Sequence, residues 1–133
     1  MQGKAIFWFM YSSTVSPDHS SSFVGEMVSK ARKSNQSLEL TGLLIFDGMH
    51  FCQYLEGPEV ALDQMLARIK ADTRHCTFQL QHHSPLNSPR QFNGWSIAYA
   101  EMDEQSSLEQ FAKTQGAAAL NALKTLLPEI DYY

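Results

Sequence analysis

A carboxamide interrupts an apolar stripe in the segment "HFCQYLEG", residues 50–57. The segment alternates like a β-strand, so Phe51, Gln53 and Leu55 share one face. A buried amide without a hydrogen-bond partner costs about 1–3 kcal/mol. The common explanation for such a glutamine is a hydrogen bond to neighbouring backbone. The alternative is a bound ligand that serves as its partner.

Two further polar residues are expected to meet Gln53. Tyr11 ends the apolar face of the segment "KAIFWFMYSS", residues 4–13, and Asn35 lies at the end of a helical segment. If both strands are central, a phenol and two carboxamides converge on a cleft between helix and sheet. Such a set suits a flat, neutral ligand that forms hydrogen bonds, rather than acid–base hydrolysis. Trp95 could form a wall of the site, although a tryptophan in a strand more often belongs to the core.

The first half of the chain predicts the elements that would position these residues. Residues 4–13 are apolar on both faces, which is typical of a central strand. Residues 17–34 carry apolar side chains at helical spacing after a serine-rich entry. Residues 38–57 predict a hairpin with Asp47-Gly48 at its tip, a dipeptide that two-residue turns favour because both central residues need positive φ.

The second half predicts another helix and two more strands. The helix begins at Pro58, where a missing N–H is harmless, and ends near Asp72. Residues 75–82 and 94–101 alternate as strands. The order β-α-β-β-α-β-β predicts an α+β fold, with a ferredoxin-like, five-stranded mixed sheet and both helices on one face. Residues 104–127 predict short helical segments that could cover the other face or contact a partner.

The composition excludes several classes of partner. The net charge of the 133 residues is −4, and the ten Lys and Arg residues are scattered. The chain therefore has no basic stripe for nucleic acid, and its longest apolar run is too short to span a bilayer. Cys52 and Cys76 lie in strand-like runs, and no signal-peptide pattern precedes them. We expect reduced thiols in a cytoplasmic protein.

The segment from Ser34 to His75, "SNQSLELTGLLIFDGMHFCQYLEGPEVALDQMLARIKADTRH", resembles the BLUF family, blue-light sensors that use a flavin. "MYSS" before the segment and "RQFNGW" after it extend the resemblance to roughly residues 4–100. The spacing of the N…TG-L…F-Q-LEG motif is specific to this family. The resemblance implies a flavin-binding domain at residues 1–103 and a C-terminal helical extension at residues 104–133.

The resemblance also implies roles for individual residues. Tyr11 would face the flavin, Gln53 would be the switching glutamine, and Asn35 would bind the edge of the isoalloxazine ring. Arg68 and Asp72 match positions that hold the ring and the ribityl chain, and a solvated ion pair one helical turn apart is the alternative explanation for both. The remaining candidates for contact with the flavin are Ser13, Ser34 and His75, the last in an Arg74-His75 dipeptide that the family shares.

The family's photochemistry would make these residues a switch. Blue light moves an electron from the tyrosine to the flavin and a proton through the glutamine, whose side chain then rotates or changes tautomer. The altered hydrogen bonding at the flavin is transmitted through the fifth strand. The switch residues would be Tyr11, Gln53, Trp95 and Ile97.

This chain departs from the family pattern in two places. Many members have methionine where this chain has Ile97, and isoleucine is neither polar nor flexible. We therefore expect weaker coupling from Gln53 to the fifth strand. The segment "SSTVS" after Tyr11 also lacks an arginine that is often found there, so contacts at the outer edge of the site would be weaker.

We expect a photoreceptor without enzyme activity, with FAD as cofactor or, alternatively, FMN. Its output would be a separate effector protein, contacted through the C-terminal helices or the sheet face, or a change in a homo-oligomer. No metal is expected. The strongest rival is a module that binds flavin or another small ligand without responding to light.

A hydrolase and a metal site are less well supported. A ferredoxin-like acyl phosphate hydrolase would need an arginine or a glycine-rich anion cradle in its first loop, and "YSSTVSPDHS" contains neither. A metal site would lack the short spacing of a structural zinc motif. Its candidate ligands would be His50, Cys52, Cys76, His82 and His83.

Overall fold

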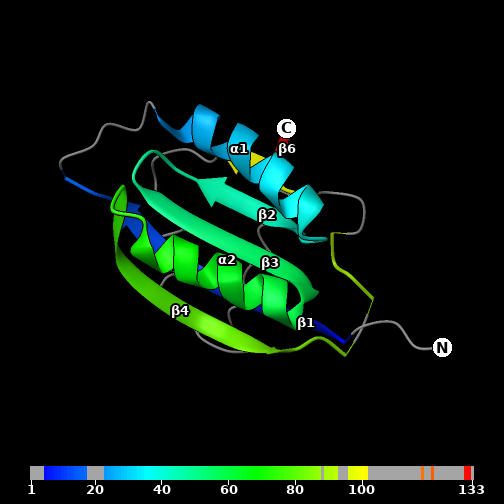
Figure 1. Cartoon of the computed structure of the whole chain (residues 1–133). Helices are drawn as coiled ribbons and strands as arrows, with labels where there is room; N and C mark the ends of the chain where they lie inside the picture. Colours follow the sequence, from blue (N-terminus) through cyan, green and yellow to red (C-terminus); the bar gives the residue numbers. More distant parts are fainter. Residues whose placement is uncertain are drawn as a thin grey trace.

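The computed structural model describes residues 5–17, 23–87, 89–92, 96–101, 118, 121 and 131–132. They form a sheet with both helices on one face, as predicted (Figure 1). We call this the helix face and the opposite side the rear face. The elements, in chain order, are β1 (Ile6–Val15), α1 (Val24–Ser37), β2 (Thr41–Phe46), β3 (His50–Pro58), α2 (Glu59–Ala71), β4 (His75–Pro85), β5 (Ala98–Glu101) and β6 (Asp131–Tyr132).

The strand order is β4-β1-β3-β2-β5-β6. β1 lies between β3 and β4 and is antiparallel to both, and β3 pairs antiparallel with β2. β5 is parallel to β2, so the sheet is mixed and has the expected ferredoxin-like arrangement with an added strand. The two-residue β6 pairs with β5 and adds a sixth strand. Two residues are too few to show strand alternation in a sequence.

The central position of β1 explains why it is apolar on both faces. Phe9 and Tyr11 belong to the core under the helices, together with Leu55 of β3. Trp8 and Met10 alternate with them and are also buried. Tyr11 is directly opposite Gln53 in the β1–β3 register. The pairing of the two central strands therefore brings together the two polar residues that interrupt the apolar stripes.

The hairpin between β2 and β3 differs from the predicted two-residue turn. Within the loop of residues 47–49, only Gly48 has a positive φ, of 98°. The side chain of Asp47 accepts hydrogen bonds from the backbone N–H groups of Met49 and His50, at 3.0 and 2.6 Å. This carboxylate stabilises a longer loop, so the second positive φ of a primed turn is not needed.

Some predicted boundaries shift in the structure. α1 begins at Val24 rather than near residue 17, and extends to Ser37. Pro58 is the last residue of β3 rather than the first of α2, because Gly57 and Pro58 remain paired with β1. β4 extends to Pro85, with irregular register against β1. β5 begins at Ala98, four residues later than predicted.

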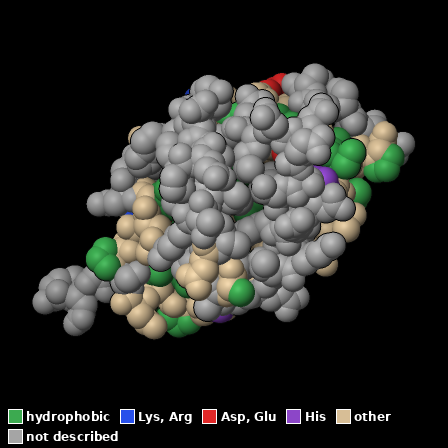
Figure 2. All heavy atoms as spheres, turned by 180° about the vertical axis from the view of Figure 1, so that it is seen from behind, with side chains coloured by type: hydrophobic (Ala, Val, Ile, Leu, Met, Phe, Trp, Pro, Cys, Tyr) green, Lys and Arg blue, Asp and Glu red, His purple; other side chains and the backbone are tan. Residues whose placement is uncertain are grey.

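The predicted C-terminal extension, residues 104–133, lies largely outside the described residues. Ala118 and Asn121 are helical and exposed. In the described part of the chain, no helix has the length and apolar character needed to cross a membrane. Seen from behind, the described hydrophobic side chains occur in separate groups (Figure 2).

Candidate functional site

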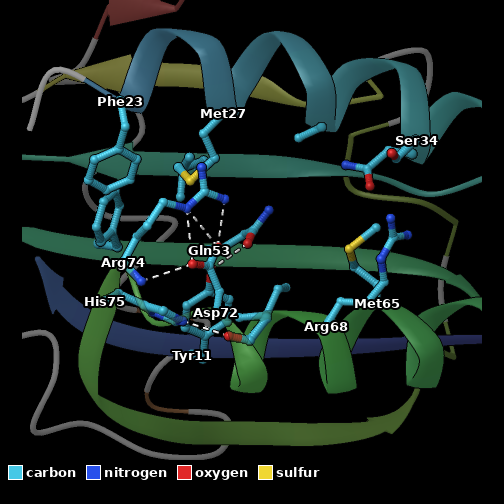
Figure 3. A pocket seen from close by; sticks show the side chains of 15 residues that line it. Tyr11, Phe23, Met27, Ser34, Gln53, Met65, Arg68, Asp72, Arg74 and His75 are labelled. Atoms are coloured by element: carbon cyan, nitrogen blue, oxygen red, sulfur yellow. Dashed lines mark hydrogen bonds and ion pairs between the residues drawn. The ribbon is translucent and has the colours of Figure 1, made fainter. Parts of the chain in front are cut away.

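A cavity of about 190 Å³ lies on the helix face, between the two helices and the central strands (Figure 3). Phe23 and Met27, at the start of α1, and Met65 of α2 supply apolar walls, while Tyr11 and Gln53 line it from the sheet. Sites for whole drug-sized ligands are usually about 300–1,000 Å³. The cavity therefore suits a flat ring system that belongs to a larger ligand.

Tyr11 and Gln53 are hydrogen-bonded to each other. The Tyr11 hydroxyl donates to Gln53 Oε1 at 2.6 Å, and the two residues are 5% and 6% exposed. Burial raises the pKa of the Tyr11 phenol above its ordinary value, with smaller effects of Cys52 and Asp72. The phenol is thus protonated at neutral pH. Among the described residues, the Gln53 Nε2 atom has no hydrogen-bond partner, so it can donate to a ligand.

Asn35 has one satisfied and one orphaned polar atom. Its Nδ2 donates to the backbone oxygen of Ser96 at 2.9 Å, which links α1 to the residues before β5. Its Oδ1 is buried and has no hydrogen-bond partner. An unsatisfied buried acceptor is costly, and Asn35 lines the cavity. The cavity therefore offers an acceptor for an N–H group of a ligand, and Ser34 lines the same region.

Asp72 pairs with Arg74 rather than with Arg68. Arg74 Nη2 lies 2.7 Å from Asp72 Oδ2, and Nε donates to both carboxylate oxygens at 3.0 and 3.2 Å. These hydrogen bonds lower the pKa of Asp72. Asp72 is the C-cap of α2 and has an extended backbone, so its carboxylate meets the following residues instead of the preceding helical turn. The ion-pair explanation for Arg68 and Asp72 is therefore wrong.

Arg68 and Arg74 both line the cavity. Among the described residues, Arg68 has no ion pair. Arg74 also lies over the ring of Phe23, 5.2 Å from its centroid. The rim of the cavity therefore carries one guanidinium neutralised by Asp72 and one available for an electron-rich group.

Ser13 and His75 form a second polar contact. The Ser13 Oγ lies 2.7 Å from His75 Nδ1, and His75 Nε2 lies 2.6 Å from the backbone oxygen of Ile69. Because a carbonyl oxygen only accepts, Nε2 carries a proton. His75 lines the cavity and Ser13 does not. Ser13 thus orients the histidine.

One predicted switch residue, Ile97, is not among the residues that line the cavity. Ile97 is 2% exposed and packs in the core just before β5. Trp95 is outside the described residues. Sequence reasoning assigned no role to Arg74 and did not select the apolar walls, including Phe23, Met27 and Met65. Helical spacing identifies such residues as buried but does not separate those facing a cavity from those in the core.

The candidate metal ligands do not form a centre. No three His, Cys, Asp or Glu residues lie close enough to hold an ion in the part of the chain that the structure describes. His50 Nδ1 lies 3.0 Å from Asp47, and His82 stacks on Trp8 with ring centroids 4.3 Å apart.

Residues 6–98 match the family described as "BLUF: Sensors of blue-light using FAD". The "Blue light- and temperature-regulated antirepressor BluF" of Escherichia coli K12 is 39% identical over 66 residues, which cover 50% of this chain and 16% of that protein. The chain thus spans less than a fifth of that relative's length.

Two solved structures are also similar. BlrB, described as a BLUF protein in the dark state, has a TM-score of 0.72 and 26% identity, covering 93% of this chain and 96% of that one. Klebsiella pneumoniae BlrP1 with FMN and cyclic diGMP has a TM-score of 0.70 and 25% identity, covering 92% of this chain and 34% of that one.

Proposed function

The chain belongs to the BLUF family of blue-light sensors that use FAD, and on that premise we propose that Tyr11 and Gln53 are its photoswitch. The cavity between α1, α2 and the sheet would hold the isoalloxazine ring of the flavin. The hydrogen bond of 2.6 Å between the Tyr11 hydroxyl and Gln53 Oε1, at the wall of that cavity, is the observation that carries this proposal.

A bound flavin would supply the absorption of blue light and the acceptor for an electron. Tyr11 is the phenol among the described residues that line the cavity, and its burial keeps it protonated until it is oxidised. The phenolic proton then has a direct path to Gln53 Oε1. A glutamine amide accepts at oxygen and donates at nitrogen, so Gln53 can reorient or change tautomer without burying a charge. The lasting change is therefore one of hydrogen bonding toward the ring.

The other lining residues would hold the cofactor. The orphaned Asn35 Oδ1 would accept a hydrogen bond from an N–H at the ring edge. Four further residues that line the cavity would help to hold the ring and the ribityl chain: Ser34, Arg68, Asp72 and His75. The cavity volume of about 190 Å³ is below that of a site for a whole drug-sized ligand, so the rest of FAD or of FMN would extend from the rim. We assign FAD, which the family description names.

The output would be another protein. The E. coli relative is named as a light-regulated antirepressor, which supports a protein effector. We propose that this chain signals to such an effector, or to another copy of itself, through residues 104–133 or the rear face of the sheet. The domain would act as the sensor and perform no reaction on a substrate.

The test is the visible absorption spectrum of the purified, flavin-loaded protein in the dark and after a blue pulse. We expect flavin bands that shift slightly to the red and then return. Gln53→Ala should keep the flavin and lose the shift, because the switching amide is gone. Gln64→Ala, an exposed glutamine on α2, should behave like wild type.

Two results would contradict specific parts of the proposal. Bound flavin without a shift in the wild-type protein would indicate a flavin-binding module that does not respond to light. A full shift in Gln53→Ala would remove Gln53 from the switch.

A further inference from the structure

Glu56 is a buried carboxylate on the rear face that the photoswitch does not use. Its exposed fraction is 0%, and each oxygen accepts two hydrogen bonds. Oε1 accepts from the Tyr54 hydroxyl at 2.9 Å and from the backbone N–H of Gln91 at 2.8 Å. Oε2 accepts from the Thr41 hydroxyl and from the backbone N–H of Phe92, both at 2.8 Å.

These contacts fasten residues 90–92 to the sheet. Arg90 Nη1 donates to Thr41 Oγ1 at 2.9 Å and to the backbone oxygen of Glu56 at 3.3 Å. The ring of Phe92 packs against that of Tyr54, with centroids 5.5 Å apart. Backbone N–H groups bound to a carboxylate form charge-assisted hydrogen bonds, which are about twice as strong as neutral ones. Glu56 thus anchors residues 90–92, which precede β5 in the chain, to the sheet.

Two residues of α1 bind the backbone of Ser96 and Ile97, just before β5. Asn35 Nδ2 donates to the backbone oxygen of Ser96, and Arg32 Nε donates to that of Ile97 at 3.3 Å. Asn35 lines the cavity, whereas Glu56 lies on the opposite side of the sheet. Residues 90–92 are therefore anchored to β3, and Ser96 is bound by a residue that lines the cavity.

We propose that Glu56 is a positioning residue for signal output: by fixing residues 90–92, it directs a displacement at the Asn35–Ser96 end into β5. Without the upstream anchor, the same displacement would be absorbed by residues 90–92. The inference rests on the proposed function. It assigns the LEG glutamate, which does not touch the cavity, to the transmission of the light signal.

Glu56→Gln is a sharp test because it preserves size and changes one oxygen to an NH₂ group. Hydroxyl groups can rotate to accept from this group, but a backbone N–H cannot. Whichever way the amide turns, Gln91 or Phe92 loses its acceptor. Hydrogen bonds to charged groups contribute about 1.5–3 kcal/mol, so amide exchange at that residue should accelerate about tenfold or more.

The decisive measurement is hydrogen exchange in the dark and under blue light, on the flavin-loaded full chain. In Glu56→Gln we expect the red shift of the flavin to match wild type. The light-minus-dark difference at Ala98–Glu101 should fall severalfold, and a new difference should appear at residues 90–92. Thr41→Val, which removes one donor to Glu56, should act in the same direction and serves if Glu56→Gln does not fold. Glu59→Gln, an exposed glutamate on α2, is the matched control.

A purely structural role predicts a different result. Residues 90–92 would then exchange faster in dark and light alike, with an unchanged difference at Ala98–Glu101, and this result would overturn the inference. A wild-type protein without a red shift would instead contradict the proposed function. The two failures are therefore separable.

Discussion

The role of each polar side chain at this site depends on its hydrogen-bond partners, and spacing along a helix or strand does not identify those partners. Asp72 shows this for a charged residue. Its spacing from Arg68 allows a helical ion pair, yet the carboxylate binds the side chain and the backbone N–H of Arg74. Because Asp72 ends α2, it acts as the joint between that helix and β4, next to the cavity rim.

Asp72→Asn should lower the stability of the protein in a pH-dependent way. The native pKa of Asp72 is depressed, mainly by the hydrogen bonds from Arg74. Its stabilising effect is therefore fully present above the unfolded-state pKa, about 3.9, and is lost as the pH falls through the lower native value. Urea unfolding midpoints should differ between wild type and variant at neutral pH and converge in acid.

Asp63→Asn provides the control for this prediction. Its side chain is 53% exposed, so its removal should change the midpoint little at neutral pH. A gap between wild type and Asp72→Asn that stayed constant into acid would contradict an ionic role for Asp72.

At the scale of elements, close packing of β2 against β3 explains the glycine of the Thr-Gly pair. A Cβ atom at Gly42 would overlap the backbone oxygen of Tyr54 and would lie 2.9 Å from a methyl group of Leu55. Backbone atoms cannot move aside as a flexible side chain can. A glycine is therefore required at position 42, where β2 packs against Tyr54. Gln53, the residue before Tyr54, lines the cavity.

Gly42→Ala should destabilise the protein by about 1–3 kcal/mol, the usual cost of overpacking. Gly25→Ala makes the same chemical change in α1, where a Cβ meets nothing within 4 Å. Alanine is the better helix former, so this control should stabilise by up to about 1 kcal/mol. Urea titrations measure the free energy of unfolding of each variant, which should decrease for Gly42→Ala and increase for Gly25→Ala. Equal effects of the two substitutions would contradict the packing argument.

At the scale of the whole molecule, the sequence was sufficient to predict those features that follow from the residue pattern within single segments. Alternation and helical spacing predicted the ferredoxin-like order, and the interrupted stripes of residues 4–13 and 50–57 predicted the meeting of Tyr11 and Gln53. The contacts of Glu56 were not predictable in this way. They join β2, β3 and the loop before β5, and no local pattern shows which loop covers a buried glutamate.

Ile97 provides a test of how the signal crosses the molecule. Its side chain is buried in the core, its backbone oxygen accepts from Arg32, and the next residue pairs with β2. Ile97→Met conserves volume and should cost less than about 1.5 kcal/mol. A flexible thioether at this position should enlarge the light-minus-dark hydrogen-exchange difference at Ala98–Glu101.

Ile97→Leu separates the two properties that methionine introduces. Leucine removes the β-branch without adding sulfur, so a gain confined to Ile97→Met would assign the coupling to the thioether. A similar gain in both variants would assign it to looser packing before β5. Equal responses in all three proteins would contradict a role for this side chain, and the signal would then enter β5 through the backbone oxygens that Asn35 and Arg32 hold.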